Sequence, residues 1–207
     1  MGDMIWLVPL IPMLSSILLM LGSGSLPRVI IGLLGVCSVG AAAVLTLLVG
    51  LDFLANPQPF QMTLWTWMQV GNFSPGIAFY FDGLTLVMMS VITGVGFLIH
   101  LFSTEFMEED VSYARYFAYL NMFVAAMLVL VMADNLLLLY LGWEGVGVAS
   151  YLLIGFYYKK PSANAAAIKA FVVNRVGDFG FALGIFAIFY MTGSINFDVI
   201  FAEAETL

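Results

Sequence analysis

Long apolar runs are the feature that most constrains this chain. A bilayer core about 30 Å thick needs roughly twenty consecutive apolar residues for each helix that crosses it. Several segments meet that requirement: approximately 5–22, 29–50, 82–104, 114–133, 136–158 and 165–191. The sequence therefore predicts an all-α polytopic membrane protein with six transmembrane helices, which form one unit over residues 1–207.

The composition supports lipid as the solvent of this chain. Hydrophobic residues make up 63% of the sequence and charged residues only 9%, whereas soluble domains keep about a quarter of their residues charged. A net charge of −7 argues against a nucleic-acid partner, because no basic patch exists to neutralise phosphates. The single cysteine, Cys37, lies in an apolar run, so we expect it to pack inside the protein.

The loop charges predict an orientation in the membrane. The connections 23–28, 105–113 and 159–164 fall on one side, and the basic residues of the loops and helix ends lie there: Arg28, Arg115, Lys159 and Lys160. The opposite side carries acidic residues but no Lys or Arg. The positive-inside rule therefore places both ends of the chain on the outer side. Because Asp3 replaces the basic region of a signal peptide, we expect the first run to be a span.

The outer loop, residues 52–81, has a composition of its own. The strings "FQMTLWTWMQV" and "GIAFYF" flank "GNFSPG", a turn-like cluster of Gly, Asn, Ser and Pro. Aromatic and β-favouring residues around such a turn are typical of a short β-hairpin. Trp65 and Trp67 suit the membrane interface, and we favour that interpretation over a specific partner contact.

Apart from the charges at helix ends, few ionisable residues lie within the predicted spans. They are Glu144, Arg175, Asp178, His100 and Lys169. A charge at the bilayer centre costs at least about 2.5–3.5 kcal/mol, so such residues normally face protein or water and have a function. At 1.5 Å per residue, Glu144 and Asp178 each lie about 20 Å from the connection that joins their helices. The two carboxyl groups are therefore expected at nearly the same depth, past the midplane toward the outer side.

The sequence predicts a partner for Asp178 but none for Glu144. Arg175 and Asp178 are spaced i, i+3 and can pair on one helix face. Lys169 is expected to be too shallow to reach Glu144, with its stem extended toward the inner surface. Glu144 is therefore expected either to be protonated or to receive its cation from elsewhere. A purely structural role in helix packing is the alternative for Glu144, as for the Arg175–Asp178 pair.

His100 lies toward the inner end of the third predicted helix. An imidazole titrates near neutral pH, so it could pass protons between the inner water and deeper groups. The alternative, which we weigh equally, is a histidine at the membrane interface that transfers no protons.

Several strings resemble a known family. "GWEGVGVASYLLIGFYY" and "AAAIKAFVVNRVGDFGFALG", with "LWTWMQVGNF", "FDGLTL", "SVITGVGFLIHLFSTEFM" and "ADNLLLLYLGWEG", are similar to the antiporter-like membrane subunits of respiratory complex I. The resemblance covers essentially the whole chain and is best to the largest of these subunits, the chain L or mitochondrial subunit 5 type. The multisubunit sodium/proton antiporters are the nearest relatives.

This resemblance implies roles for the membrane charges. In the family, a glutamate of the fifth helix pairs with a lysine on the seventh, and Glu144 matches that glutamate. Arg175 and Asp178 are implied to belong to the coupling charges of the same half-channel, and His100 matches a histidine near the end of the third helix. The chain carries no counterpart of the seventh-helix lysine, so a longer subunit or a second chain is expected to supply it.

The function expected from these features is proton translocation in an NADH:quinone oxidoreductase of a bacterial inner membrane. No nucleotide fingerprint or cysteine array is present, so this chain is expected to hold no cofactor or metal. NAD, FMN, iron–sulfur clusters and quinone are expected in partner subunits. A Na⁺/H⁺ antiporter subunit and a non-conducting scaffold are the alternatives.

Overall fold

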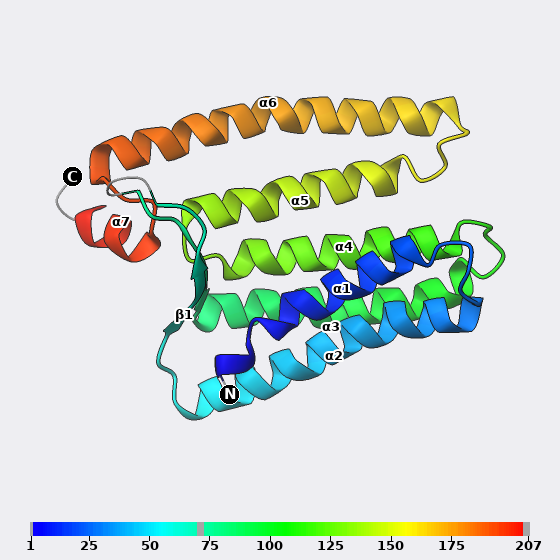
Figure 1. Ribbon diagram of the computed structural model, residues 1–207, viewed down its shortest axis with the longest axis horizontal. Helices are drawn as coiled ribbons and strands as arrows, with labels where there is room; N and C mark the ends of the chain where they lie inside the picture. Colours follow the sequence, from blue (N-terminus) through cyan, green and yellow to red (C-terminus); the bar gives the residue numbers. More distant parts are fainter. Residues whose placement is uncertain (1, 70–72, 205–207) are drawn as a thin grey trace.

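The protein is a bundle of long helices with a small hairpin at one end (Figure 1). The computed structural model describes residues 2–69 and 73–204. In chain order the elements are a 3-10 turn (Gly2–Met4), α1 (Leu7–Leu21), α2 (Arg28–Ala55), β1 (Phe60–Thr66), β2 (Gly76–Phe81), α3 (Gly83–Phe106), α4 (Tyr113–Met132), α5 (Leu136–Ile154), α6 (Pro161–Thr192) and α7 (Phe197–Ala204). Within the described ranges, the five helices α2 to α6 are long and apolar enough to cross a membrane. The predicted helical membrane fold with its short hairpin is confirmed.

The helix bounds differ from the predicted ones in physically simple ways. The first helix has 15 residues, which is short for a bilayer core. The sixth helix begins at Pro161 rather than 165, because proline fits the first turn, where its missing N–H is not needed. The fifth ends at Ile154 rather than 158. The short helix α7 lies beyond residue 191, where the last predicted helix ends.

Helices α1 to α4 form the packed part of the molecule, which we call the α1–α4 bundle. Its interior includes hydrogen-bonded neutral polar groups among apolar side chains. Asn121 on α4 is fully buried, accepts a hydrogen bond from the Ser38 hydroxyl at 2.6 Å and donates to the Phe117 carbonyl at 2.9 Å. The Ser16 hydroxyl donates to the Ala118 carbonyl at 2.7 Å. These bonds satisfy the buried groups without any charge.

Helix α5 packs closely on α4 at a glycine. A Cβ atom added to Gly142 would lie 2.6 Å from the backbone nitrogen of Leu130 on α4. A side chain therefore cannot be placed there without separating the two helices. Gly147, on the same helix, has open space around it.

The hairpin holds the turn between α4 and α5. Strands β1 and β2 pair antiparallel, from Phe60 opposite Phe81 to Thr66 opposite Gly76. The predicted turn falls partly on residues 70–72, which lie outside the described residues. The Asp134 backbone N–H donates to Ala78 at 3.1 Å, and the Gln61 amide donates to the Asp134 carboxylate at 2.5 Å. We call this end of the bundle the hairpin end.

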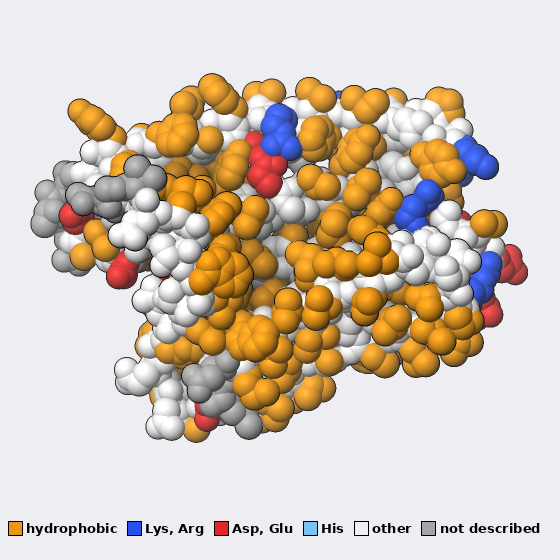
Figure 2. Space-filling view, viewed as in Figure 1, with side chains coloured by type: hydrophobic (Ala, Val, Ile, Leu, Met, Phe, Trp, Pro, Cys, Tyr) orange, Lys and Arg blue, Asp and Glu red, His pale blue; other side chains and the backbone are white. Residues whose placement is uncertain are grey.

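The opposite end carries Arg28, Arg115, Lys159 and Lys160, and we call it the basic end. Figure 2 shows Lys and Arg side chains there, with acidic side chains beside them. Arg28 donates to the Asp110 carbonyl at 3.3 Å, which ties the start of α2 to the loop between α3 and α4. The four basic residues that define the orientation thus gather in space as expected.

The expected packing of Cys37 is wrong. Its side chain is exposed, on a face of α2 next to α1. The apolar run around it covers the whole circumference of α2, so the sequence does not distinguish the face toward lipid from the face toward the bundle. Trp65 and Trp67 are exposed on and beside the hairpin, and their interfacial role stays a prediction.

Helices α5 and α6 form a layer beside the bundle, which we call the α5–α6 layer (Figure 1). Over the most apolar part of each helix, 44% of the residues are buried in α4 but only 11% in α6. Helix α6 packs mainly on α5 and α7, where Leu136, Ile185 and Ile195 form a small apolar cluster. Most of its surface is therefore open.

Candidate functional site

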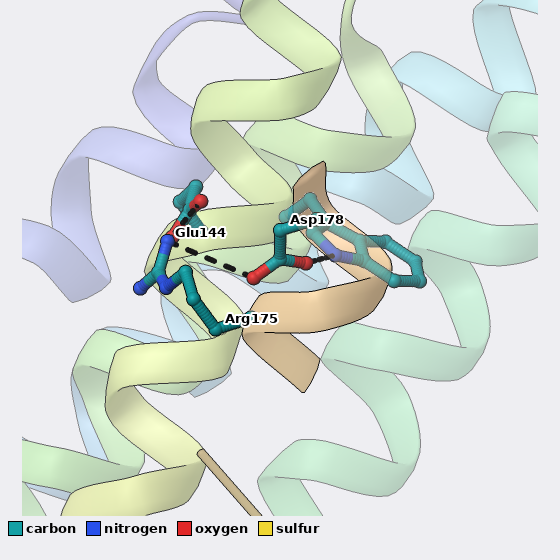
Figure 3. Close-up of polar contacts among 4 residues, drawn as sticks. Glu144, Arg175 and Asp178 are labelled. Atoms are coloured by element: carbon teal, nitrogen blue, oxygen red, sulfur yellow. Dashed lines mark hydrogen bonds and ion pairs between the residues drawn. The ribbon is translucent and has the colours of Figure 1, made fainter. Parts of the chain in front are cut away.

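Three charged residues meet between α5 and α6, and we call them the charge cluster: Glu144, Arg175 and Asp178 (Figure 3). Arg175 Nη1 donates a hydrogen bond to Glu144 Oε1 and lies 3.7 Å from Asp178 Oδ2. The guanidinium group therefore bridges two carboxylates on different helices. The side chain of Asp178 is 8% exposed, that of Glu144 21% and that of Arg175 45%.

The expectation that Glu144 has no cation within this chain is wrong. We expected Arg175 to serve Asp178 alone, because their i, i+3 spacing puts them on one helix face. The two helices are antiparallel neighbours, however, and the long arginine side chain reaches across to Glu144. The expected equal depth of Glu144 and Asp178 is confirmed, since one guanidinium group contacts both.

The cluster lies near the middle of both helices. Arg175 comes fourteen residues after Pro161, and Asp178 comes fourteen residues before Thr192. Each interval corresponds to about 21 Å of helix. The cluster thus lies at the middle of α6, which starts four residues earlier than the sequence predicted, and its expected depth past the bilayer midplane stays a prediction.

A tryptophan that sequence reasoning missed completes the site. Trp143 Nε1 donates a hydrogen bond of 2.7 Å to Asp178 Oδ1, and the aromatic ring packs against Phe181. Asp178 thus has one oxygen fixed by a neutral donor and the other directed toward Arg175 (Figure 3). The available signal was the position of Trp143 directly before Glu144, on a helix predicted to lie beside α6.

Two further sequence candidates lie apart from the cluster. His100 is fully buried on α3, where its Nδ1 lies 2.8 Å from the Gly96 carbonyl oxygen. Its Nε2 is buried and has no hydrogen-bond partner among the described residues. Nothing in the structure brings it into contact with Glu144, and its part in proton transfer stays a prediction. Lys169 is exposed on α6, as a side chain that extends to the surface would be.

In this arrangement the Arg175 guanidinium group can change its ion-pair partner between Glu144 and Asp178. Arg175 contacts Glu144 but lies slightly too far from Asp178 for a direct hydrogen bond, so a small movement would reverse that preference. Most of α6 is not buried within the described residues, and the Glu144 side chain keeps 21% of its surface exposed. Among the described residues, no group of three or more His, Cys, Asp or Glu side chains could hold a metal ion.

Comparison with known families gives two matches along the chain. Residues 67–117 match the N-terminal family of NADH-ubiquinone oxidoreductase (complex I) chain 5. Residues 133–206 match the transmembrane family of the NADH:quinone oxidoreductase and Mrp antiporter proteins. The second match contains the whole charge cluster.

Curated relatives agree with these matches. NADH-quinone oxidoreductase subunit L of Escherichia coli is 50% identical over 94% of this chain and 32% of its own length. The subunit L of Pseudomonas aeruginosa is 46% identical over 90% of this chain and 31% of its own length. This chain belongs to the family of antiporter-like membrane subunits of complex I. It spans about a third of the length of these relatives.

Solved structures support the fold of this antiporter-like family member. A structure of the Mrp complex from Dietzia sp. DQ12-45-1b matches 95% of this chain and 20% of that chain, with a TM-score of 0.79 and 19% identity. The membrane-bound sulfane sulfur reductase, an archaeal respiratory membrane complex, matches 93% and 28% with a TM-score of 0.70 and 20% identity. The protein is an integral membrane protein with the antiporter-like arrangement of helices.

Proposed function

We propose that the protein translocates protons in the membrane arm of an NADH:quinone oxidoreductase, with Glu144 as the negative charge that controls a proton-carrying lysine. The observation that carries this proposal is the arginine shared between Glu144 and Asp178 at mid-helix, on a face of the protein that is largely open. Buried or half-buried acids near the bilayer centre are typical of proton relays. The identity to subunit L relatives supports the same function.

In the mechanism that we propose, Arg175 changes its partner. A lysine from the rest of a longer subunit, or from a second chain, would approach Glu144 on the open face. Arg175 would then move toward Asp178, which Trp143 already holds in place. When the lysine withdraws, its pKa falls because it loses an opposite charge, and its proton is released to neighbouring groups.

The partners and location follow from the same proposal. The other membrane subunits of the complex and the lipid bilayer surround the chain, and NAD, FMN, iron–sulfur clusters and quinone belong to partner subunits. The protein sits in a bacterial inner membrane with the basic end inside, so that the hairpin end and both ends of this segment face outward. His100, near the basic end of α3, is proposed as an entry point for protons on that side.

Replacing the carboxyl group tests the central claim. Glu144→Gln in the full-length protein within its complex should reduce proton pumping about tenfold or more, because a neutral amide supplies no negative charge to change the pKa of the lysine. Proton uptake and NADH oxidation are measured together in proteoliposomes. Glu105→Gln is the matched control, since that acid is exposed at the end of α3. Undiminished pumping by Glu144→Gln would refute the role of this residue.

A second candidate is sodium/proton exchange, which one observation favours: the family match over residues 133–206 includes the Mrp antiporters. Sodium-dependent proton movement in the absence of NADH would support it. If the chain were a scaffold without transport, neutralising Glu144 or Asp178 would reduce assembly of the complex but leave its turnover unchanged.

A further inference from the structure

Arg115 at the basic end forms no ion pair with a carboxylate of the described residues. It lies in the first turn of α4 and donates to the Phe156 carbonyl at 3.1 Å. Its guanidinium group packs over the rings of Phe156 and Tyr158, at 5.0 and 4.9 Å from their centroids. Its Nε is buried with no hydrogen-bond partner, and no described carboxylate forms an ion pair with it. A buried donor on a charged group is costly unless something accepts from it.

A cleft adjoins this arginine. It has a volume of about 560 Å³ and lies between the basic ends of α4, α5 and α6. Its polar lining comes from Arg115, Tyr119, Tyr151, Tyr158 and Asn164, and no acidic residue lines it. A space of this size fits a small molecule or a lipid headgroup. The cleft therefore combines one unneutralised cation with several neutral hydrogen-bonding groups.

A neighbouring cleft differs from the first in the charged residues that line it. It has a volume of about 430 Å³ and shares Arg115, Phe156 and Tyr158 with the first. Lys159 and Lys160 line it, together with Glu109 and Asp110. Acidic side chains thus accompany the lysines, whereas the first cleft leaves Arg115 as its only charged group. An anionic ligand is favoured in the first cleft.

We propose that the first cleft binds the phosphate of an anionic phospholipid. A planar guanidinium group matches phosphate oxygens well, and Arg115 lines the cleft. The adjoining start of α6 has no acidic residue in its first turn, so its positive dipole end also favours an anion. The side chains next to the cleft on the outer surface, Ile154, Ile168 and Val172, are exposed and apolar and suit the acyl chains. A lipid satisfies both the polar and the apolar part of this surface.

Lipid binding can be measured directly on the full-length protein, purified with its copurifying subunits in a neutral detergent. Native mass spectrometry counts the bound molecules during titration with palmitoyl-oleoyl phosphatidylglycerol or phosphatidylcholine. Arg115→Gln should lower the affinity for phosphatidylglycerol about tenfold or more, because it removes hydrogen bonds between charged groups. Binding of phosphatidylcholine should change little. Equal phosphatidylglycerol binding by the wild type and this variant would overturn the proposal.

A second pair of variants leaves Arg115 in place, in case its replacement disturbs folding. Ile168→Trp fills the mouth of the cleft, whereas Val176→Trp adds the same bulk about two turns further along α6, outside the side chains assigned to the acyl chains. The first should lose the phosphatidylglycerol and the second should keep it. Identical lipid counts in the two variants would contradict the proposal.

Two other occupants are distinguishable in the same experiment. Inorganic phosphate that displaces phosphatidylglycerol at equal concentration would show a free anion site and overturn the lipid assignment. Loss of a copurifying subunit from Ile168→Trp, with unchanged lipid counts, would show a protein interface instead. Neither result depends on proton pumping, so a failure here is separate from a failure of the proposed function.

Discussion

The α1–α4 bundle and the α5–α6 layer are built from similar apolar helices but treat their polar groups in opposite ways. In the bundle, Asn121 and Ser38 are neutral, buried and bonded to each other. In the layer, Glu144 and Arg175 are charged and partly exposed near the centre of long helices. The neutral pair is satisfied locally, whereas the charged group keeps a face open to further partners.

This difference suggests that the two regions have different roles, one in stability and the other in function. A satisfied neutral hydrogen bond in a close-packed interior fixes the helices relative to each other. A charge cluster on an open face lowers the stability of the fold unless opposite charges from elsewhere pair with it. Its ion pairs can rearrange when those charges move. The bundle is therefore expected to govern folding, and the layer to govern transport.

The largest expected effect of a substitution is a loss of proton pumping, and it is expected in the α5–α6 layer. Arg175→Met leaves two carboxylates without their shared cation, so we expect pumping to fall about tenfold or more while the fold is kept. Arg175→Lys, which retains the charge, should lose less. Proton uptake in proteoliposomes measures both variants, and thermal unfolding checks the fold. Equal pumping by Arg175→Met and the wild type would remove the proposed functional contrast between the two regions.

The next effect tests how firmly the layer is attached to the bundle. Gly142→Val places a side chain against the backbone of Leu130, so we expect a loss of about 3 kcal/mol in the free energy of unfolding. Gly147→Val is the matched control, because open space surrounds that position. Thermal and denaturant unfolding in detergent provide the measurement. Similar losses in both variants would mean that helix propensity, not the close approach, decides the effect.

A smaller effect is expected inside the bundle. Asn121→Leu removes the hydrogen bond that links α4 to Ser38 on α2, whose hydroxyl keeps only the Gly35 carbonyl of its own helix, and should destabilise the protein by about 1 kcal/mol, with little change in pumping. The exposed Ser90→Ala serves as the control, since its hydroxyl only donates within its own helix. A large loss of pumping at unchanged stability would contradict the division between the two regions.

The smallest effect concerns pH at the hairpin end. Burial raises the pKa of the Asp134 carboxyl, and the negative charge of Asp198 adds to this, while the hydrogen bond from Gln61 opposes it. Because the folded pKa lies above the unfolded value, stability is full below the unfolded pKa and decreases as pH rises through the folded pKa. Asp134→Asn should flatten this dependence, with a change of at most a few degrees in melting temperature.

Unfolding scans from pH 3 to 8 compare Asp134→Asn with the wild type. Gln61→Leu removes the donor and should raise the pKa of Asp134 further, which shifts the decrease in stability to higher pH. The same pH profile for all three proteins would show that Asp134 does not titrate in this range.

The sequence predicted the helices because apolar runs of membrane length have few alternatives in lipid. It also located Glu144, Arg175 and Asp178, because ionisable residues inside such runs are rare. It could not assign the partner of Arg175, since that depends on the relative rotation of two helices that are apolar on all sides. The same ambiguity misplaced Cys37, whose exposed face carries no periodic signal.

The contact between Trp143 and Asp178 was hidden for a similar reason. An indole in an apolar helix has many possible environments, and only the packed geometry shows which acceptor its N–H reaches. The short helix α7 was missed because eight residues give too little periodicity to distinguish it from a loop.

The position of the charge cluster halfway along α6 has a consequence for the direction of transport. A proton held there has about the same length of helix between itself and each end of α6. Distance alone therefore cannot make the transfer vectorial. Directionality must come from the order in which the routes to the two sides open and close, so a variant that leaves both routes open at once should dissipate the gradient rather than reverse it.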